Sequence, residues 1–335
     1  MLRSILILLL FSAGVTSAQQ TVDNSGVSST AAAMLDGFID MRAEYKHSST
    51  KEFSRDEQLA MDDWCYAMEK KFPDAYETSY AWHVNDHYSD GSGEKIKDAY
   101  KKAPNDKRVV KEMFGYYVMK DEISSANSML LKVSSYYSKN TLNYYRDVMP
   151  TQGVIITSSI EDAIPLYILQ LKDKLGKEAV IVNMDFLINK GYLQKQVSKL
   201  GAGSQSFYGN EKAYLKLVMN KNKQVHLSST VSQNYLKGNA QNCFLTGLSY
   251  QSNPASHVAS LEKFWKEVAQ KNFSSLSLTS SEKRLYTNYL PPLLTLYKLQ
   301  LARGGKNETL KKAIIALADK VQQTKNVKDI LNTYE

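Results

Sequence analysis

Residues 153–183, GVIITSSIEDAIPLYILQLKDKLGKEAVIVN, decide the fold class of this chain. Val154-Ile155-Ile156 is a short apolar run behind a glycine, which is typical of a buried strand. An amphipathic helix follows and ends at Gly176, and residues 179–182 form a second apolar run. A strand, a helix and a strand joined by short loops predict two parallel strands with a right-handed crossover.

Further strands extend this unit to about residue 255. Apolar patterns predict a third strand at 224–229 and a fourth at 243–245, with helices at 192–200 and 211–219. We therefore expect residues 150–255 to form a small α/β domain, in which helices cover both faces of a parallel sheet in three layers.

Helical periodicity dominates on both sides of this unit. A first amphipathic helix is expected at 31–46, and residues 52–149 consist of helices separated by short turns. One hairpin, with its turn at Asp121-Glu122, resembles the tetratricopeptide repeat in the spacing of its core positions Met113, Tyr117, Ala126, Leu130 and Val133. We therefore expect tetratricopeptide-like helical hairpins over 52–149 and another helical region over 256–335.

The first residues predict export. MLRSILILLLFSAGVTSAQQ begins with a basic residue, continues with an apolar run from Ile5 to Val15, and offers small residues up to Ala18 for a signal peptidase. The run is shorter than the about 20 apolar residues of a membrane span. We expect cleavage after Ala18, a secreted or periplasmic protein, and no integral membrane span after cleavage. Residues 19–50 should hold a disordered polar segment and the first helix.

Composition and charge narrow the function classes. The chain of 335 residues has a net charge of +8, but its lysines are interleaved with acids, so a solvated surface is expected and a nucleic-acid partner is not. Two cysteines and five scattered histidines lack close ligand spacing, so no metal and no cofactor are expected. Export would permit a disulfide between Cys65 and Cys243, but two buried free thiols are the favoured interpretation.

The turn after the first strand supplies candidate binding residues. It lies at the carboxyl end of a parallel strand, where open α/β sheets bind ligands, and a helix start attracts anions. The candidates are Thr157, Ser158, Ser159 and Asp162.

The helix after this turn has two candidate starting points. With Asp162 as the N-cap, Pro165 falls at the third helical position, where its missing N–H costs nothing. A start at Ser159 would instead place Pro165 inside the helix, at a cost of about 3 kcal/mol. We therefore expect Asp162 to cap the helix, with the earlier start as the alternative.

Three tyrosine pairs supply a second set of candidates. The pairs 116–117, 136–137 and 144–145 are expected to place one ring in the core and one at its edge. Packing is the favoured interpretation, because a tyrosine ring mostly contributes buried area. The alternative is an aromatic-lined groove for a peptide or glycan, bound by Tyr117, Tyr137 and Tyr145.

Two segments resemble a known family. The run ITSSIEDAIPLYILQLKDKLGKEAVIVNMDFLINKGYLQKQV, residues 156–197, is similar to a segment in the extracytoplasmic tails of bacterial multi-spanning membrane proteins classed with the protein mannosyltransferase-like glycosyltransferases. A later segment keeps the Gly-Leu-x-Tyr pattern of that family at residues 247–250. The positions kept in the first segment are Thr157, Asp162, Pro165, Leu166, Leu169, Gln170 and Asn183.

The resemblance covers about residues 100–253, and it implies helical repeats followed by a small α/β unit outside the membrane. Ser159 stands where the family has a turn glycine, and Ile160 where it has an acid. These 335 residues hold no counterpart of the membrane part in which sugar transfer would occur. The resemblance therefore implies location and architecture, and it does not imply transferase activity.

Three functions are compatible with these patterns. The favoured one is a non-catalytic scaffold or binding protein of the bacterial envelope, which binds a protein or glycan on its helical-repeat surface. A soluble partner of the envelope glycosylation or secretion machinery is an alternative that rests on the resemblance alone. The other alternative is an α/β hydrolase or transferase, although no Gly-x-Ser-x-Gly motif surrounds its candidate nucleophile. Its nucleophile, base and orienting acid would be Ser158 or Ser159, His226 or His257, and Asp162 or Asp185.

Overall fold

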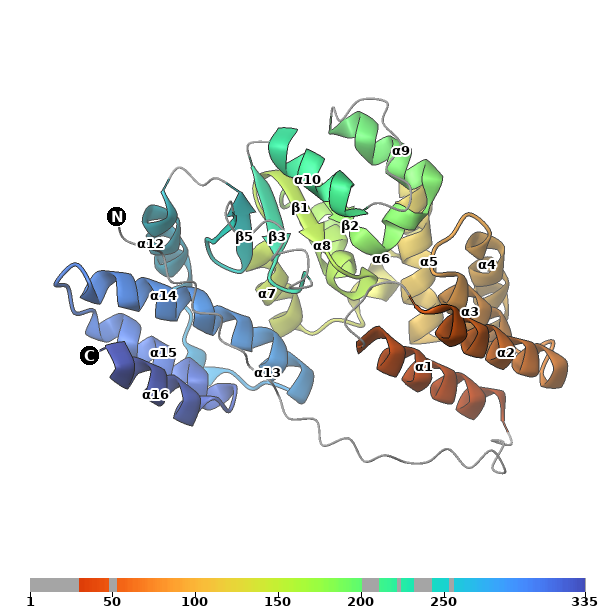
Figure 1. Cartoon of the computed structure of the whole chain (residues 1–335), viewed down its shortest axis with the longest axis horizontal. Coiled ribbons are helices and arrows are strands. Elements are labelled where there is room, and N and C mark those ends of the chain that lie inside the picture. Colours follow the sequence, from red (N-terminus) through yellow and green to blue (C-terminus); the bar gives the residue numbers. More distant parts are fainter. Residues whose placement is uncertain are drawn as a thin grey trace.

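The computed structural model describes residues 30–47, 53–200, 211–221, 224–231, 243–252 and 256–334. It confirms the expected fold class, with helices on both sides of a small α/β unit. In Figure 1 the N-terminal helices lie on the right, the C-terminal helices on the left, and the sheet between them. The predicted signal peptide and nearly all of the polar segment after it lie outside the described residues.

The N-terminal helices follow one another with short turns, as expected. The hairpin of α5 and α6 turns at Asp121, which adopts a left-handed conformation with φ 66°. Met113 and Ala126 are buried in this hairpin. The bounds of the helices are α1 Ala31–His47, α2 Arg55–Lys71, α3 Tyr76–Asp86, α4 Ser92–Lys102, α5 Lys107–Lys120, α6 Ile123–Ser134 and α7 Lys139–Val148.

The sheet is mixed, whereas a parallel sheet was expected. Its order is β2-β1-β3-β5-β4; β1 pairs in parallel with β2 and β3, and β5 pairs antiparallel with β3 and β4. The strand β5 was not predicted, because its sequence SYQS has no apolar run. The elements of this unit are β1 Gln152–Thr157, α8 Ile160–Lys172, β2 Glu178–Asn183, η1 Met184–Ile188, α9 Lys190–Lys199, α10 Glu211–Lys221, β3 Val225–Ser228, β4 Cys243–Leu245 and β5 Ser249–Ser252.

Both faces of the sheet are covered, which gives the three layers that were expected. Val154 and Ile156 of β1 belong to one core cluster, together with Leu193 of α9 and residues of the N-terminal helices. Ile155 belongs to the other cluster, together with Leu166 of α8 and the C-terminal helices. Successive residues of a strand point to opposite faces, so the sheet separates the two clusters.

The C-terminal helices form the second group. Thr279 and Glu282 make a capping box at the start of α13. Pro291 and Pro292 lie in the first turn of α14, where a missing N–H costs nothing. The bounds are α12 His257–Val268, η2 Phe273–Ser275, α13 Ser280–Tyr286, η3 Thr287–Tyr289, α14 Leu290–Leu301, α15 Glu308–Lys320 and α16 Thr324–Tyr334.

The expected start of α8 is wrong. The helix begins at Ile160 with Ser159 as its N-cap, so Asp162 lies in its first turn and Pro165 lies inside it. Tertiary packing explains the earlier start: Ile160 is buried against α5, where a Cβ added to Gly115 would lie 2.5 Å from its Cδ1. Burying an isoleucine side chain contributes about 1.5–3 kcal/mol, which offsets most of the cost of an internal proline.

The cysteines are free thiols, as the favoured interpretation predicts. Cys65 is buried in α2 and Cys243 is buried in β4. Burial raises the pKa of both thiols, to about 11 for Cys243. Neither thiol is therefore a reactive thiolate at neutral pH.

Candidate functional site

The carboxyl ends of β1, β2 and β3 meet at one edge of the sheet, where open α/β folds bind ligands. Thr157 at the end of β1 pairs with Asn183 at the end of β2, and both are fully buried. Ser228 ends β3. Polar residues follow each strand, and side chains from α7 and from the turn between α3 and α4 reach the three strand ends.

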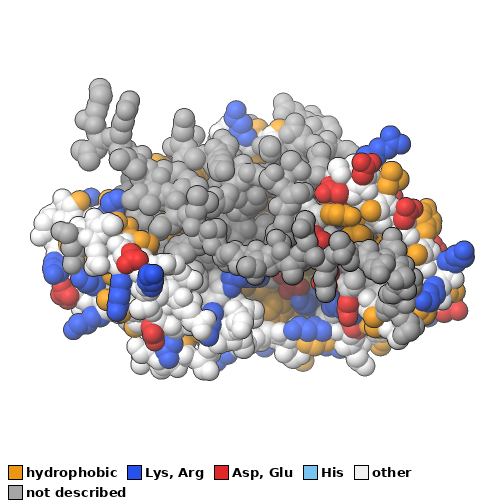
Figure 2. Space-filling view, turned by 60° about the horizontal axis from the view of Figure 1, so that its bottom comes forward, with side chains coloured by type: hydrophobic (Ala, Val, Ile, Leu, Met, Phe, Trp, Pro, Cys, Tyr) orange, Lys and Arg blue, Asp and Glu red, His pale blue; other side chains and the backbone are white. Residues whose placement is uncertain are grey.

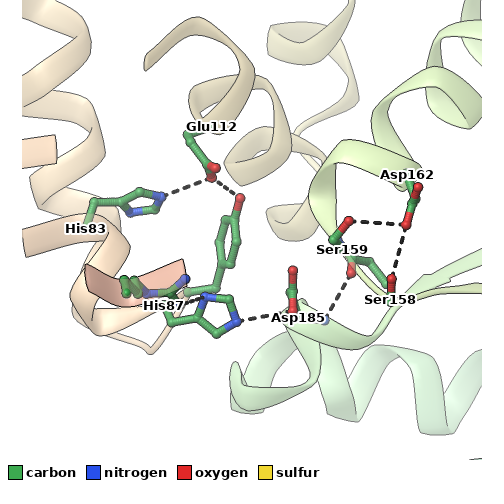
Figure 3. Close-up of polar contacts among 10 residues, drawn as sticks. His83, His87, Glu112, Ser158, Ser159, Asp162 and Asp185 are labelled. Atoms are coloured by element: carbon green, nitrogen blue, oxygen red, sulfur yellow. Dashed lines mark hydrogen bonds and ion pairs between the residues drawn. The ribbon is translucent and has the colours of Figure 1, made fainter. Parts of the chain in front are cut away.

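A buried carboxylate organises the end of β1. The hydroxyl groups of Ser158 and Ser159 donate to Asp162 Oδ2 at 3.1 and 3.2 Å (Figure 3), and Tyr145 of α7 donates to Oδ1 at 2.5 Å. Burial and the neighbouring Asp162 raise the pKa of Tyr145 well above its ordinary value, so its phenol remains a donor. Asp162 also lies in the first turn of α8, where the helix dipole favours a negative charge. The side chains of Ser158, Ser159 and Asp162 thus bond one another within the turn. Asp162 also joins α7 to α8 through Tyr145.

The exposed side of the same turn is bonded to the N-terminal helices. Glu161 accepts from Lys111 of α5, and Tyr137 donates to Glu161 Oε2 at 3.5 Å. The Lys111 ammonium also lies 5.8 Å from the centre of the Tyr137 ring. Tyr137 is therefore close to the predicted binding turn.

The structure brings most of the predicted binding residues together. Thr157, whose hydroxyl donates to Val182 O at 3.4 Å, begins the turn that holds the two serines and Asp162. Tyr145 contacts this turn directly, and Tyr137 contacts it through Glu161. Tyr117 lies apart from it, on α5 beside Tyr116.

The turn between α3 and α4 reaches the end of β2. His87 Nε2 lies 3.2 Å from Asp185 Oδ1, and Arg42 Nη2 lies 3.0 Å from His87 Nδ1. Because a guanidinium only donates, His87 Nδ1 must accept, and Nε2 carries the proton that it donates to Asp185. Figure 3 shows the contact between His87 and Asp185. Together with Arg42, it links α1, the α3–α4 turn and η1.

Tyr88 anchors the same turn more deeply. Its hydroxyl donates to Glu112 of α5, and its ring packs edge-on against Phe186 with 4.7 Å between the centres. His87 and Tyr88 both have left-handed φ values, 43° and 63°. Such values are strained for non-glycine residues and persist only where surrounding contacts impose them. Here the contacts hold the turn against η1, at the end of β2.

The end of β3 is bonded to α7 and the C-terminal helices. The Tyr144 hydroxyl lies 3.0 Å from Ser229 Oγ and accepts from Asn288 Nδ2 at 3.1 Å. The Tyr144 ring is fully buried and packs edge-on against Tyr289. Neighbouring tyrosines of α7 thus hold two different strand ends, because Tyr145 bonds the turn after β1.

The residues of the hydrolase alternative have other partners. Both serines donate to Asp162, whereas His226 Nδ1 lies 3.2 Å from Ser249 Oγ. His257 Nε2 lies 2.8 Å from the carbonyl oxygen of Leu245. Among the described contacts, neither histidine reaches either serine. The candidate nucleophiles of this alternative therefore bond the candidate acid Asp162, and neither candidate base is beside them.

Several residues of this edge were not predicted. Arg42 and Glu112 come from helices that the sequence indicated only as packing elements, and His87 and Tyr88 come from the turn between two such helices. Asp185, in contrast, could be named as a candidate from the sequence, because it follows the second strand just as the serines follow the first. No local pattern could pair it with His87, which lies 98 residues away.

The surface is hollowed elsewhere. Figure 2 shows a hollow between the N-terminal and C-terminal helices, with hydrophobic, acidic and basic side chains on its floor. Two shallow hollows lie on the C-terminal helices, one lined by Lys298 and Tyr334 and the other by Arg303 and Glu308. Their lining residues are distinct from the groups at the strand ends.

Comparisons with known proteins identify no relative: no protein-family model matches the chain, nor does any curated protein or solved structure. The resemblance to extracytoplasmic tails and the tetratricopeptide-like assignment therefore stay predictions. Across the described ranges, no helix has both the length and the apolar character of a membrane span. The same residues contain no cluster of three or more His, Cys, Asp or Glu side chains that could hold a metal.

Proposed function

We propose that this chain is an exported, non-catalytic binding protein of the bacterial envelope, which takes up a protein or glycan on its helical surface. Export rests on the pattern of residues 1–18. The binding role rests on the contacts that the polar groups at the strand ends make with side chains of the helical regions.

One observation carries the proposal: side chains of the helical regions, from α7 and from the turn between α3 and α4, bond the polar groups at all three strand ends. The contacts are Tyr145 to Asp162, His87 to Asp185, and Tyr144 to Ser229. A catalytic base or nucleophile must lie within hydrogen-bond reach of its substrate, with its reactive atom available. These groups instead attach the helices to the sheet, which supports a scaffold role for the α/β unit.

The arrangement of the helices supports the same proposal. The hollow between the two groups of helices offers a concave surface of mixed polarity (Figure 2). Helical arrays generally act by presenting such extended surfaces to a partner. A partner would thus contact the helices, and the sheet would keep them in place.

The test is to pass an envelope extract over immobilised protein comprising residues 19–335, and to assay the same protein with ester and glycoside probes. We expect saturable retention of a protein or glycan and no turnover. A variant with Ser158→Ala and Ser159→Ala is the control, because these changes remove the candidate nucleophiles. Turnover by the wild type that this variant loses would overturn the proposal, and so would a failure to retain any component.

A further inference from the structure

The outward face of α2 carries exposed apolar side chains. Leu59 and Tyr66 are 49% and 61% exposed. They are seven positions apart, which places them on one side of the helix, about two turns from each other. The buried residues of α2, which are Met61, Cys65 and Met68, lie on its other side. Leu59 and Tyr66 therefore face away from the core.

A ring from the next helix lies beside them. The Trp82 ring of α3 lies 5.0 Å from the Tyr66 ring, with 81° between the ring planes, and Trp82 is half-buried. We call Leu59, Tyr66 and Trp82 the α2 patch. Apolar side chains gathered in this way, unlike single exposed ones, indicate an interaction surface.

Carboxylates surround the α2 patch. Residues three or four positions apart on a helix are neighbours on its surface. By this spacing, the neighbours of the patch include Asp62, Asp63, Glu69 and Asp86. In the described part of the chain, none of these four carboxylates forms an ion pair. Two lysines offset part of their charge: Lys70 follows Glu69, and the Lys95 ammonium lies 5.7 Å from the Trp82 ring.

One of these carboxylates is held between the two helices. Asp62 Oδ1 accepts from Gln58 Nε2 at 2.9 Å and from Asn85 Nδ2 of α3 at 2.7 Å. Gln58 Nε2 also donates to Asn85 Oδ1 at 3.0 Å. These bonds fix the negative charge of Asp62 beside the patch, so a partner cation meets a preorganised carboxylate.

We propose that the α2 patch binds a basic amphipathic helix of a protein partner. The inference rests on the proposed function, since it names one contact surface and the class of partner. The apolar face of such a helix packs on Leu59, Tyr66 and Trp82, and the lysines and arginines beside that face meet the carboxylates. The patch lies on helices, so it offers a partner strand no sheet edge to pair with.

A glycan and a membrane fit the α2 patch less well. Sugar rings stack on flat aromatic faces, whereas the rings of Tyr66 and Trp82 are nearly perpendicular and Leu59 is aliphatic. An anionic membrane surface would repel the four carboxylates. A basic amphipathic helix matches both the apolar surface and the charge.

A second copy of this chain also fits less well. Residues 283–334 are basic, with ten Lys or Arg against three Asp or Glu, and α14, α15 and α16 lie at the opposite end of the molecule from α2 (Figure 1). The exposed large apolar side chains of the described residues are Leu59, Tyr66, Ile123, Leu131 and Phe244. None of them lies on the C-terminal helices, which therefore match the charge of the patch but not its apolar surface.

The test is to titrate the full chain into a fluorescein-labelled amphipathic helical peptide of leucine and lysine, at low and at high salt, by fluorescence anisotropy. We expect saturable binding that weakens with salt. A variant with Leu59→Ser and Tyr66→Ser should lose about tenfold or more in affinity, because the packing surface is removed. The matched control is Ile123→Ser with Leu131→Ser, which removes two exposed apolar side chains from α6 and should leave the affinity unchanged.

A second pair of variants tests the carboxylates. Asp63 and Glu69 are exposed, and Asp63→Asn with Glu69→Gln should lower the affinity about threefold or more at low salt, and less at high salt. Asp319→Asn with Asp329→Asn makes the same change in net charge at exposed positions of α15 and α16. This control should have a smaller effect, because its carboxylates lie far from the patch.

Three outcomes would overturn the inference: no binding of the peptide, equal binding of a peptide with glutamate in place of lysine, or undiminished binding after Leu59→Ser with Tyr66→Ser. Self-association of the wild type that this variant loses would also overturn it, because the patch would then bind a second copy. Circular dichroism verifies that each variant is folded. If the wild type and the Leu59→Ser, Tyr66→Ser variant retain the same component of the envelope extract equally, this inference fails while the proposed function stands.

Discussion

Asp162 is a buried carboxylate whose three donors are hydroxyl groups of Tyr145, Ser158 and Ser159. Bonds to a charged acceptor are stronger than bonds between neutral groups. Asp162→Asn keeps the shape but replaces one acceptor oxygen with a donor, which would oppose a hydroxyl. We expect a loss of about 2–3 kcal/mol in the free energy of unfolding, measured by urea denaturation.

The control for this change lies at the other end of the same helix. Asp173 forms an exposed ion pair with Arg146. Asp173→Asn should therefore cost less than about 1 kcal/mol. Equal losses for the two variants would show that the hydroxyl cluster is not a special stabilising feature.

His226 gives the protein a specific pH dependence. Burial lowers its pKa from 6.5 to about 4. Between these values the unfolded chain binds a proton that the folded protein does not, so stability falls as the pH decreases from about 6.5 to about 4. On account of this residue, the free energy of unfolding is about 3 kcal/mol higher above pH 6.5 than below pH 4.

Urea denaturation of wild type and His226→Gln across this pH range measures the effect. The wild type and the variant have all other titrating groups in common. The difference between their curves of unfolding free energy against pH therefore reports on His226 alone. The wild type should lose more stability on acidification than the variant. Parallel curves would contradict the predicted role of burial.

At the scale of elements, β2 is an edge strand whose backbone is bonded by side chains. Gln170 donates to the carbonyl oxygens of Gly176 and Ala179, both at 2.8 Å. Tyr167 donates to Ile181 O at 3.2 Å, and Tyr192 contacts the same oxygen at 3.5 Å. Closing an edge in this way prevents pairing with another chain.

Gln170→Leu tests this closure. The change introduces an apolar side chain of similar size. It leaves Ala179 O without its side-chain donor, whereas Gly176 O still accepts from the backbone N–H of Ala179 at 2.9 Å. We expect a loss of about 1–3 kcal/mol in the free energy of unfolding, seen in urea denaturation. Tyr167→Phe is the comparison, and it should cost less because Tyr192 still contacts Ile181 O. A Gln170 variant as stable as the wild type would contradict this role.

At the scale of the whole molecule, the sheet joins two core clusters. Residues on alternate sides of β1 belong to different clusters, one shared with the N-terminal helices and one with the C-terminal helices. The two clusters therefore cannot unfold separately without disrupting the same strand. We expect a single cooperative unfolding transition.

Calorimetry of wild type and Leu293→Ala tests this coupling. Leu293 is fully buried in the C-terminal cluster, so the change should cost about 2–5 kcal/mol. The variant should show one transition at lower temperature, with signal loss from all helices together. Two transitions, only one of them shifted, would show that the helical groups unfold independently.

Hydrophobic periodicity predicted most of the fold. Apolar runs located β1, β2 and β4, because a buried strand needs consecutive apolar residues. In β3, which reads VHLS, apolar and polar residues alternate. The unpredicted β5 is SYQS, whose polar side chains carry no such signal. For the candidate site, the serines and Asp162 could be found because they follow a strand directly. Tyr145 was a candidate from its aromatic pair, but no local pattern predicted its bond to Asp162. The bond between His87 and Asp185 could not be predicted either, because these residues lie 98 positions apart.

The sequence by itself determined where helices and strands form, since periodic burial of apolar side chains is a local property. It also determined that polar groups would gather at the carboxyl ends of the parallel strands. Only the tertiary structure decided what those groups do, and where α8 begins. Both depend on contacts between residues far apart in the chain: Ile160 packs at Gly115, and His87 reaches Asp185. Burial and hydrogen bonding across these contacts outweigh the local cost of an internal proline and of a strained turn.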